Sequence, residues 1–158
     1  MISPIILPLE SLSRRVAEAV ISRPVLLVYL FGSAATGHMT PFSDVDIALV
    51  VDEHFDFKPS RLQFELEIED ELTARCELDA VDVRVINAAP LLLRGEVVTY
   101  GRLLFARDED QRIDFETRTR REYFDFLPAA RFHQSAFFEN LRQRGLSGQR
   151  SKTAESAR

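Results

Sequence analysis

The feature that most constrains the fold is a pair of apolar runs separated by a polar segment that contains glycine. Residues 25–31 read VLLVYLF and residues 44–51 read DVDIALVV. Runs of β-branched and large apolar side chains without polar alternation are typical of strands buried on both faces of a sheet. The two runs therefore predict a sheet with helices packed on it.

The rest of the chain alternates helices and strands. Apolar residues at helical spacing predict an amphipathic helix at residues 9–22. Further helices are predicted at 60–75, 90–99 and 112–127, and further strands at 78–86 and 103–106. We expect Pro128 to kink or restart the last helix. The fold class is α/β (α+β): a small mixed β-sheet flanked by helices, with a C-terminal helical extension.

Length bounds the domain organisation. The chain has 158 residues, enough for one ordinary domain. We expect residues 1–108 to form its core and residues 109–144 to form a helical segment that packs on the core and contacts a partner. Residues 145–158 lack periodicity and are expected to be a disordered tail. No apolar run approaches the roughly 20 residues of a membrane-spanning helix.

Charge and cysteine usage exclude other function classes. The net charge is -5 and the pI is near 5.3, whereas binding to nucleic-acid backbones relies on Lys and Arg, so we expect no direct nucleic-acid binding. The single cysteine, Cys76, cannot form an internal disulfide, and no basic residue precedes the apolar N-terminal stretch as in a secretory signal. A cytoplasmic protein is expected.

Candidate metal ligands lie at the start of the second apolar run. Side chains alternate along a strand, so Asp44 and Asp46 share one face, roughly 6.5 Å apart. Two carboxylates this close raise each other's pKa unless a cation lies between them. Asp82 opens the next predicted strand and is the third candidate, because pairing of the strands would bring it beside the other two. Asp79 lies on the opposite face by parity and is the weaker candidate. Oxygen ligands without nearby His or Cys favour Mg²⁺ or Mn²⁺ over zinc.

The segment between the two strands predicts a phosphate-binding turn. Gly32 allows the backbone to approach a phosphate, and Ser33 with the amides of a helix start offers donors to anionic oxygens. A Gly-Ser turn or an Asp-x-Asp pair taken alone is more often a plain turn or two solvated acids. Here the acids begin a run too hydrophobic for a solvent-facing edge, which favours a site. Arg84 shares a face with Asp82 and predicts either an ion pair with it or a phosphate contact.

The arrangement of Gly-Ser, ten residues and Asp-x-Asp resembles the signature of the nucleotidyltransferase superfamily that includes DNA polymerase β, in its minimal single-domain form. Three segments are similar, in the same order, to segments of MntA-type antitoxins: LFGSAATGHMTPFSDVDIALV, VDVRVINAAPLLLRGEVVTYGRLLFARDE and RREYFDFLPAARF. The resemblance covers residues 24–132 and implies the minimal nucleotidyltransferase fold.

The resemblance also implies an activity, that of a Mg-dependent protein adenylyltransferase. Gly32 and Ser33 would hold the phosphates of ATP, Asp44 and Asp46 would bind two Mg²⁺, and Asp82 would complete the triad. AMP would pass from ATP to a tyrosine of a partner toxin of the HEPN class, an RNase that is thereby silenced, in a hetero-oligomer of toxin and antitoxin. The sequence departs from a common variant in having Ala34 where an arginine often follows Gly-Ser.

Two other functions are compatible with the same residues. One is a nucleotidyltransferase acting on a small hydroxylated molecule such as an aminoglycoside, although such enzymes generally add a second domain to shape the acceptor site. The other is a catalytically silent module that neutralises a toxin by covering it.

The C-terminal third is rich in phenylalanine. The aromatic residues there either pack the last helix onto the sheet or face a partner. We expect packing for Phe115 and Phe124. A partner surface is the alternative at Phe132, Phe137 and Phe138.

Overall fold

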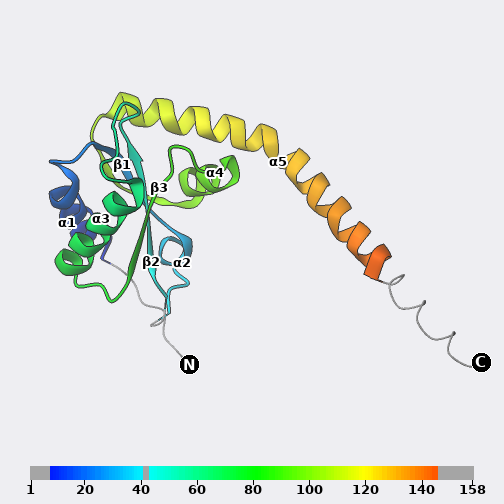
Figure 1. Cartoon of the computed structure of the whole chain (residues 1–158), viewed down its shortest axis with the longest axis horizontal. Coiled ribbons are helices and arrows are strands. Elements are labelled where there is room, and N and C mark those ends of the chain that lie inside the picture. Colours follow the sequence, from blue (N-terminus) through cyan, green and yellow to red (C-terminus); the bar gives the residue numbers. More distant parts are fainter. Residues whose placement is uncertain (1–7, 41–42, 146–158) are drawn as a thin grey trace, which may run out of the picture. The chain divides into compact units, whose positions relative to one another are not determined.

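The computed structural model describes residues 8–40 and 43–145, with side chains described as far as residue 132. In chain order the elements are α1 (Leu9–Val20), β1 (Val25–Phe31), α2 (Gly32–Thr36), β2 (Val45–Val51), α3 (Arg61–Cys76), β3 (Val81–Val85), α4 (Leu91–Tyr100), β4 (Arg102–Ala106) and α5 (Glu109–Gly145) (Figure 1). The predicted helices and strands are confirmed, with ends that differ by a few residues except at the end of α5. The tail expected at 145–158 lies, apart from its first residue, outside the described residues.

The described strands form one mixed sheet in the order β3-β2-β1-β4. β1 pairs antiparallel with β2 and with β4, whereas β2 and β3 pair in parallel. β1 and β2 are the two inner strands, which explains why their sequences are the most continuously apolar in the chain. The predicted mixed sheet flanked by helices is therefore confirmed.

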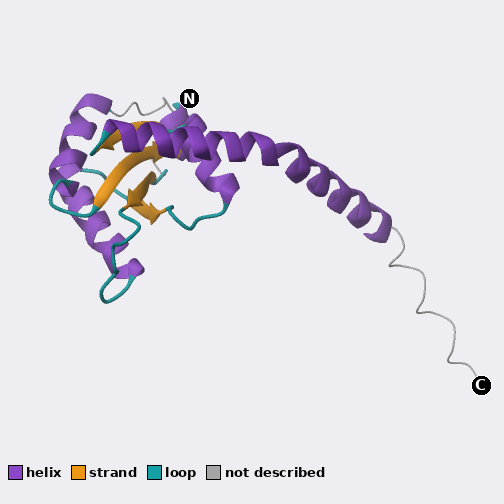
Figure 2. Ribbon diagram, turned by 90° about the horizontal axis from the view of Figure 1, so that it is seen from above, coloured by secondary structure: helices purple, strands orange, loops and turns teal. Residues whose placement is uncertain are grey.

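The two faces of the sheet are covered by different helices. Val28, Ile47 and Val83 belong to the larger core, which α1 and α3 complete. Tyr29, Ala48 and other residues of alternate parity belong to a smaller core, to which α4 and the start of α5 contribute. Figure 1 shows α1 and α3 on one side of the strands and α4 on the other, and Figure 2 shows from above that the strands lie between helices.

The start of α5 is held to the sheet by a buried polar cluster. The hydroxyl of Tyr29 donates a hydrogen bond of 3.0 Å to Oε1 of Glu116. Oε2 of Glu116 forms ion pairs with Arg112 at 3.1 Å and with Arg120 at 3.0 Å. Burial and the Glu116 carboxylate both raise the pKa of Tyr29, so this phenol stays protonated. Phe115 packs beside the cluster against the smaller core, as predicted.

Strand β3 is an edge of the sheet, and α3 supplies partners for its outward-facing amides. Val83 N donates to Oε1 of Glu69 at 3.0 Å, and Val85 N donates to Oε1 of Glu65 at 2.8 Å. Helix α3 begins at a capping serine, Ser60, whose Oγ accepts from Gln63 N at 3.1 Å. The same helix thus covers one face of the sheet and protects its edge.

Helix α5 differs from the sequence prediction. The helix expected to reach about residue 127 and to kink or restart at Pro128 is one element that continues through Pro128 to Gly145. An interior proline costs roughly 3 kcal/mol because it removes one hydrogen bond and crowds the preceding turn. Ala129 and Ala130, which follow it, are strong helix formers and favour continuation.

The chain divides into two compact units, Met1–Tyr123 and Phe124–Arg158, so α5 begins in the first and ends in the second. The division between a core at 1–108 and a partner-binding segment at 109–144 stays a prediction. Phe124 is 51% exposed, so less of it is buried than predicted. Phe132 is 71% exposed, while the side chains of Phe137 and Phe138 lie outside those described. Across ranges 8–40 and 43–145, no helix has the length and apolarity to span a membrane.

Candidate active site

The three candidate acids meet at one end of two neighbouring strands. Asp46 of β2 is the register partner of Asp82 in β3 across the parallel pair, as the sequence predicted. Asp44 directly precedes the first residue of β2. By strand parity Asp46 and Asp82 share the sheet face of Ala48, opposite the larger core. Asp44 is exposed, whereas Asp46 and Asp82 are half-buried, so the acids are open to a ligand from solvent.

Gly32 lies against the carboxylate of Asp46. The last residue of β1, Phe31, is the register partner of Asp46, so the chain leaves β1 directly beside that acid. Gly32 has φ +68°, and a β-carbon placed on it would overlap Oδ2 of Asp46. The position therefore needs glycine for two reasons, its left-handed backbone and the space that Asp46 occupies.

The short helix α2 starts at this glycine and contains Ser33. The carbonyl of Ser33 accepts from His38 N at 3.0 Å and from Thr36 Oγ1 at 3.3 Å, which closes the turn. Gly37 ends the helix in the left-handed conformation, with φ +74°. His38 is exposed and its Nδ1 lies 3.2 Å from Thr36 Oγ1. The predicted glycine-bounded turn is thus a single helical turn that begins beside the acids.

The electrostatics around Asp46 disfavour its charge. Burial is the largest cause that raises the pKa of this carboxyl, and the charges of Asp82 and Asp44 add to it, while Arg84 opposes them. The Asp46 carboxylate forms no side-chain hydrogen bond or ion pair with another described residue. It is a half-buried acid beside two like charges, which is an environment that a bound cation stabilises.

Asp82 is engaged differently. Its Oδ2 accepts hydrogen bonds from Nε of Arg84 at 3.0 Å and from the terminal nitrogen at 2.9 Å. This pairing raises the pKa of the Arg84 guanidinium. The side chain of Arg84 is 58% exposed, so solvent screens the pair and its contribution to stability is small. Of the two roles predicted for Arg84, the structure contains the ion pair.

The donor set fits a hard divalent cation. Asp44, Asp46 and Asp82 supply carboxylate oxygens, the ligand type that Mg²⁺ and Mn²⁺ prefer, and the repulsion between these acids is what such an ion relieves. No three His, Cys, Asp or Glu side chains of the described ranges stand close enough together to hold a metal as they are oriented. Asp82 faces Arg84 in this structure, so binding would require its carboxylate to turn toward Asp46.

Comparison with known proteins identifies the domain type. The sequence model of a family described as "Polymerase beta, Nucleotidyltransferase" matches residues 16–110, which contain all the candidate site residues. A search of curated proteins gave no match.

Several solved structures share the fold. A toxin–antitoxin complex with AMP-PNP contains a chain of 21% identity and TM-score 0.59; the match covers 86% of this chain and 99% of that one. A tri-AMPylated HEPN toxin in complex with MNT antitoxin from Shewanella oneidensis gives 20% identity and TM-score 0.57, covering 85% and 98%. An MntA–HepT complex gives 20% identity and TM-score 0.55, covering 85% and 97%. At these identities the likeness shows the fold.

Proposed function

Because the chain belongs to the polymerase β nucleotidyltransferase family, we propose that it is a Mg-dependent protein adenylyltransferase, an antitoxin that silences a HEPN-type toxin by transferring AMP from ATP to a toxin tyrosine. The observation that carries the proposal is the contact of Gly32 with Asp46, in register with Asp82. This arrangement sets a helix start, where a phosphate can approach the backbone, directly beside acids that suit metal ions.

In this proposal Gly32 and Ser33 bind the ATP phosphates. The amides at the start of α2 donate to phosphate oxygens, and the lack of a side chain at Gly32 lets the nucleotide approach the backbone. Ala34 offers no charged contact to the phosphates, so backbone donors and the acids carry this part of the binding.

Asp44, Asp46 and Asp82 are the residues that would hold the metal ions. When bound, such ions neutralise charge on the triphosphate and lower the pKa of a coordinated hydroxyl. The tyrosine oxygen forms a bond to the α-phosphorus, the bond from that phosphorus to the bridging oxygen breaks, and pyrophosphate leaves. A tyrosine hydroxyl has a pKa of about 10, so its proton needs an acceptor near neutral pH. We assign that role to the Asp82 carboxylate once it has left Arg84.

The proposed partner, a HEPN-type toxin, is supported by the solved structures of similar fold, which contain toxin–antitoxin complexes and, in one case, an AMPylated HEPN toxin. Exposed aromatic rings on the second unit, at Phe124, Phe126 and Phe132, support a protein partner and a hetero-oligomer with the toxin.

Intact-mass measurement of the toxin tests the proposal. The chain is incubated with ATP, Mg²⁺ and a HEPN toxin encoded beside it, and the toxin should become heavier by one or more AMP units. The Asp44→Asn, Asp46→Asn variant should leave the toxin mass unchanged. An unmodified toxin with the wild-type chain would refute the proposal.

Two further measurements, one with labelled ATP and one in cells, test the two alternative functions. Labelled AMP on a small hydroxylated molecule, formed without any protein partner, would favour a small-molecule transferase. Full protection of cells by the double Asn variant would favour a silent binding module.

A further inference from the structure

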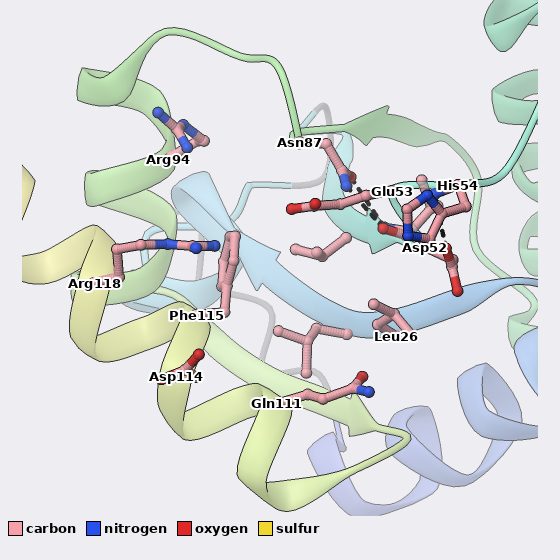
Figure 3. A pocket seen from close by; sticks show the side chains of 13 residues that line it. Leu26, Asp52, Glu53, His54, Asn87, Arg94, Gln111, Asp114, Phe115 and Arg118 are labelled. Atoms are coloured by element: carbon pink, nitrogen blue, oxygen red, sulfur yellow. Dashed lines mark hydrogen bonds between the residues drawn. The ribbon is translucent and has the colours of Figure 1, made fainter.

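A cavity opens on the same sheet face as the acids, but at the other end of β2. Its volume is about 350 Å³, and residues of β1, β2, α4 and α5 line it, together with the turn after β2 (Figure 3). Val50 in its wall is four residues beyond Asp46, about 13 Å at standard strand rise. All its lining residues belong to the first compact unit. The cavity is therefore separate from the candidate active site.

Two arginines reach this cavity without a counter-ion. Nε of Arg94 is buried and has no hydrogen-bond partner among the described residues. Arg118 forms no ion pair with Asp114, one helical turn earlier, or with any other carboxylate in the described part of the chain. A buried donor left unpaired costs free energy, and such a group usually marks the place of an ion or a water. Two guanidinium groups together are suited to phosphate oxygens.

The other walls of the cavity offer apolar and hydrogen-bonding contacts in addition to the two arginines. Phe115 and the apolar side chains of Leu26 and Val50 form a surface for a flat or apolar body. Figure 3 shows Arg94 and Arg118 toward one end of the cavity and Asp52 and His54 toward the other, while the Glu53 side chain extends from the same turn toward the arginines. Carboxylates at that end are acceptors for hydroxyl and amino groups of a ligand.

We propose that this cavity is a binding site for a nucleoside monophosphate, whose phosphate contacts Arg94 and Arg118 and whose ring packs on Phe115. The site is independent of the candidate active site and of the transfer reaction. The ligand fits the volume, because ligand pockets begin at about 300 Å³. The carboxylate of Asp114 lies near Arg118 in sequence and weakens the site for anions.

The test is an NMR titration of the full chain in EDTA, with AMP, adenosine and inorganic phosphate as separate probes. AMP should shift the amides of Leu26, Asn87 and Phe115, which belong to the cavity, and should bind more tightly than the other two probes. The same shifts should persist in the Asp44→Asn, Asp46→Asn variant.

Matched variants test the arginines. Arg118→Gln should weaken AMP binding by roughly tenfold or more, because it removes a charge-assisted hydrogen bond. Asp114→Asn should strengthen binding. Arg121→Gln makes the same charge change three residues further along α5, outside the cavity lining, and should have no effect. Circular dichroism confirms that each variant is folded.

Three outcomes would overturn the proposal. One is AMP-induced shifts confined to Gly32 and Ser33, since these would assign the nucleotide to the active site. Another is equal affinity for adenosine and AMP, which would remove the role of the arginines. The third is equal weakening by Arg118→Gln and Arg121→Gln, which would reduce the effect to net charge.

Discussion

Two acids on the same side of the sheet, Glu116 and Asp46, have opposite surroundings. Glu116 is 7% exposed, and a tyrosine hydroxyl and two arginines satisfy its oxygens. Asp46 is half-buried beside two like charges, and no described side chain pairs with its carboxylate. Residues of the chain itself neutralise and hydrogen-bond the carboxylate of Glu116, whereas the carboxylate of Asp46 is suited to a bound cation. The contrast distinguishes an acid that stabilises the fold from one that is available for chemistry.

The largest expected effect comes from neutralising the unpaired acids. Asp44→Asn with Asp46→Asn should lower toxin AMPylation by about 100-fold or more, the order found when an electrostatic group of an active site is removed. Stability should not fall, because the change removes repulsion between carboxylates. Initial rates by intact mass and urea unfolding measure the two quantities.

Glu96→Gln is the control for that variant, since Glu96 is an exposed acid of α4 that is not one of the candidate metal ligands. It should change neither rate nor stability. A double Asn variant that unfolds at lower urea than wild type would mean that Asp46 is structural, like Glu116.

Removing the paired acid Glu116 should lower the stability of the protein, in contrast to the double Asn variant. Glu116→Ala leaves two arginines and the Tyr29 hydroxyl without their acceptor, which should lower the free energy of unfolding by about 2 kcal/mol; this is below the range for fully buried pairs because Arg120 is 42% exposed. Urea denaturation followed by circular dichroism measures it. Unchanged stability would contradict the role given to this cluster.

Comparing substitutions at two glycines distinguishes the effect of backbone strain from the effect of contact with Asp46. Gly32 and Gly37 both have positive φ, +68° and +74°, but only a β-carbon at Gly32 meets Asp46, while nothing lies within 4 Å at Gly37. Alanine at either position should cost about 1–2 kcal/mol of stability through left-handed strain. Gly32→Ala should in addition lower AMP transfer by about tenfold or more through displacement of the carboxylate. Equal loss of activity in both variants would show that the contact is unimportant.

Addition of Mg²⁺ tests directly whether Asp46 binds a cation. Mg²⁺ at ten times its dissociation constant should stabilise the wild-type chain by about 1.4 kcal/mol, because it binds the folded state. Thermal unfolding with and without EDTA should show this shift, and Asp46→Asn should lose it. A shift of equal size in both proteins would place the ion elsewhere.

The smallest effect is expected at a third kind of carboxylate, paired but near the surface. Glu71 accepts a hydrogen bond from Arg23 at 2.8 Å, and this bond lowers the pKa of Glu71 below its usual 4.5. The folded state therefore holds this proton less tightly than the unfolded state, so the pairing stabilises the protein above pH 4.5 and the gain is lost as the pH falls through the folded-state pKa. The difference in unfolding free energy between wild type and Glu71→Gln should shrink over this range and stay below about 1 kcal/mol. A constant difference between pH 3 and 6 would contradict the assignment.

Much of the sheet was predictable because its information is local. The apolar runs of β1 and β2 predicted inner strands, and parity predicted that Asp46 and Asp82 share a face. Neither observation specified whether β3 pairs with β2 in parallel, since both directions bring the acids together. Helical structure on both sides of Pro128 was expected, with a kink or restart there, but the sequence did not specify that α5 is one element, because a local breaker and its helix-forming neighbours favour different outcomes.

The contacts that refine the site were not predictable, because they join residues far apart in sequence. The overlap that a β-carbon on Gly32 would make with Asp46 follows from the register of β1 and β2, which the sequence does not specify. The Tyr29–Glu116 bond spans 87 positions, and neither residue has a sequence pattern that marks its partner. Arg84 was expected either to pair with Asp82 or to contact phosphate, and its rotamer decided between these roles.

The carboxylates of Glu65 and Glu69 on α3 accept the hydrogen bonds that a further strand would accept at this edge of the sheet. They accept hydrogen bonds from the amides of Val83 and Val85, which follow Asp82 in β3, so a helix on the opposite face of the sheet holds the strand that carries this acid. Substitutions on α3 that never touch a nucleotide should therefore tilt β3 and alter the geometry of transfer. Because these two amides of β3 are already paired, a strand of a neighbouring molecule is less able to add to this edge. The end of the sheet that carries the acids can therefore stay open to solvent without promoting aggregation.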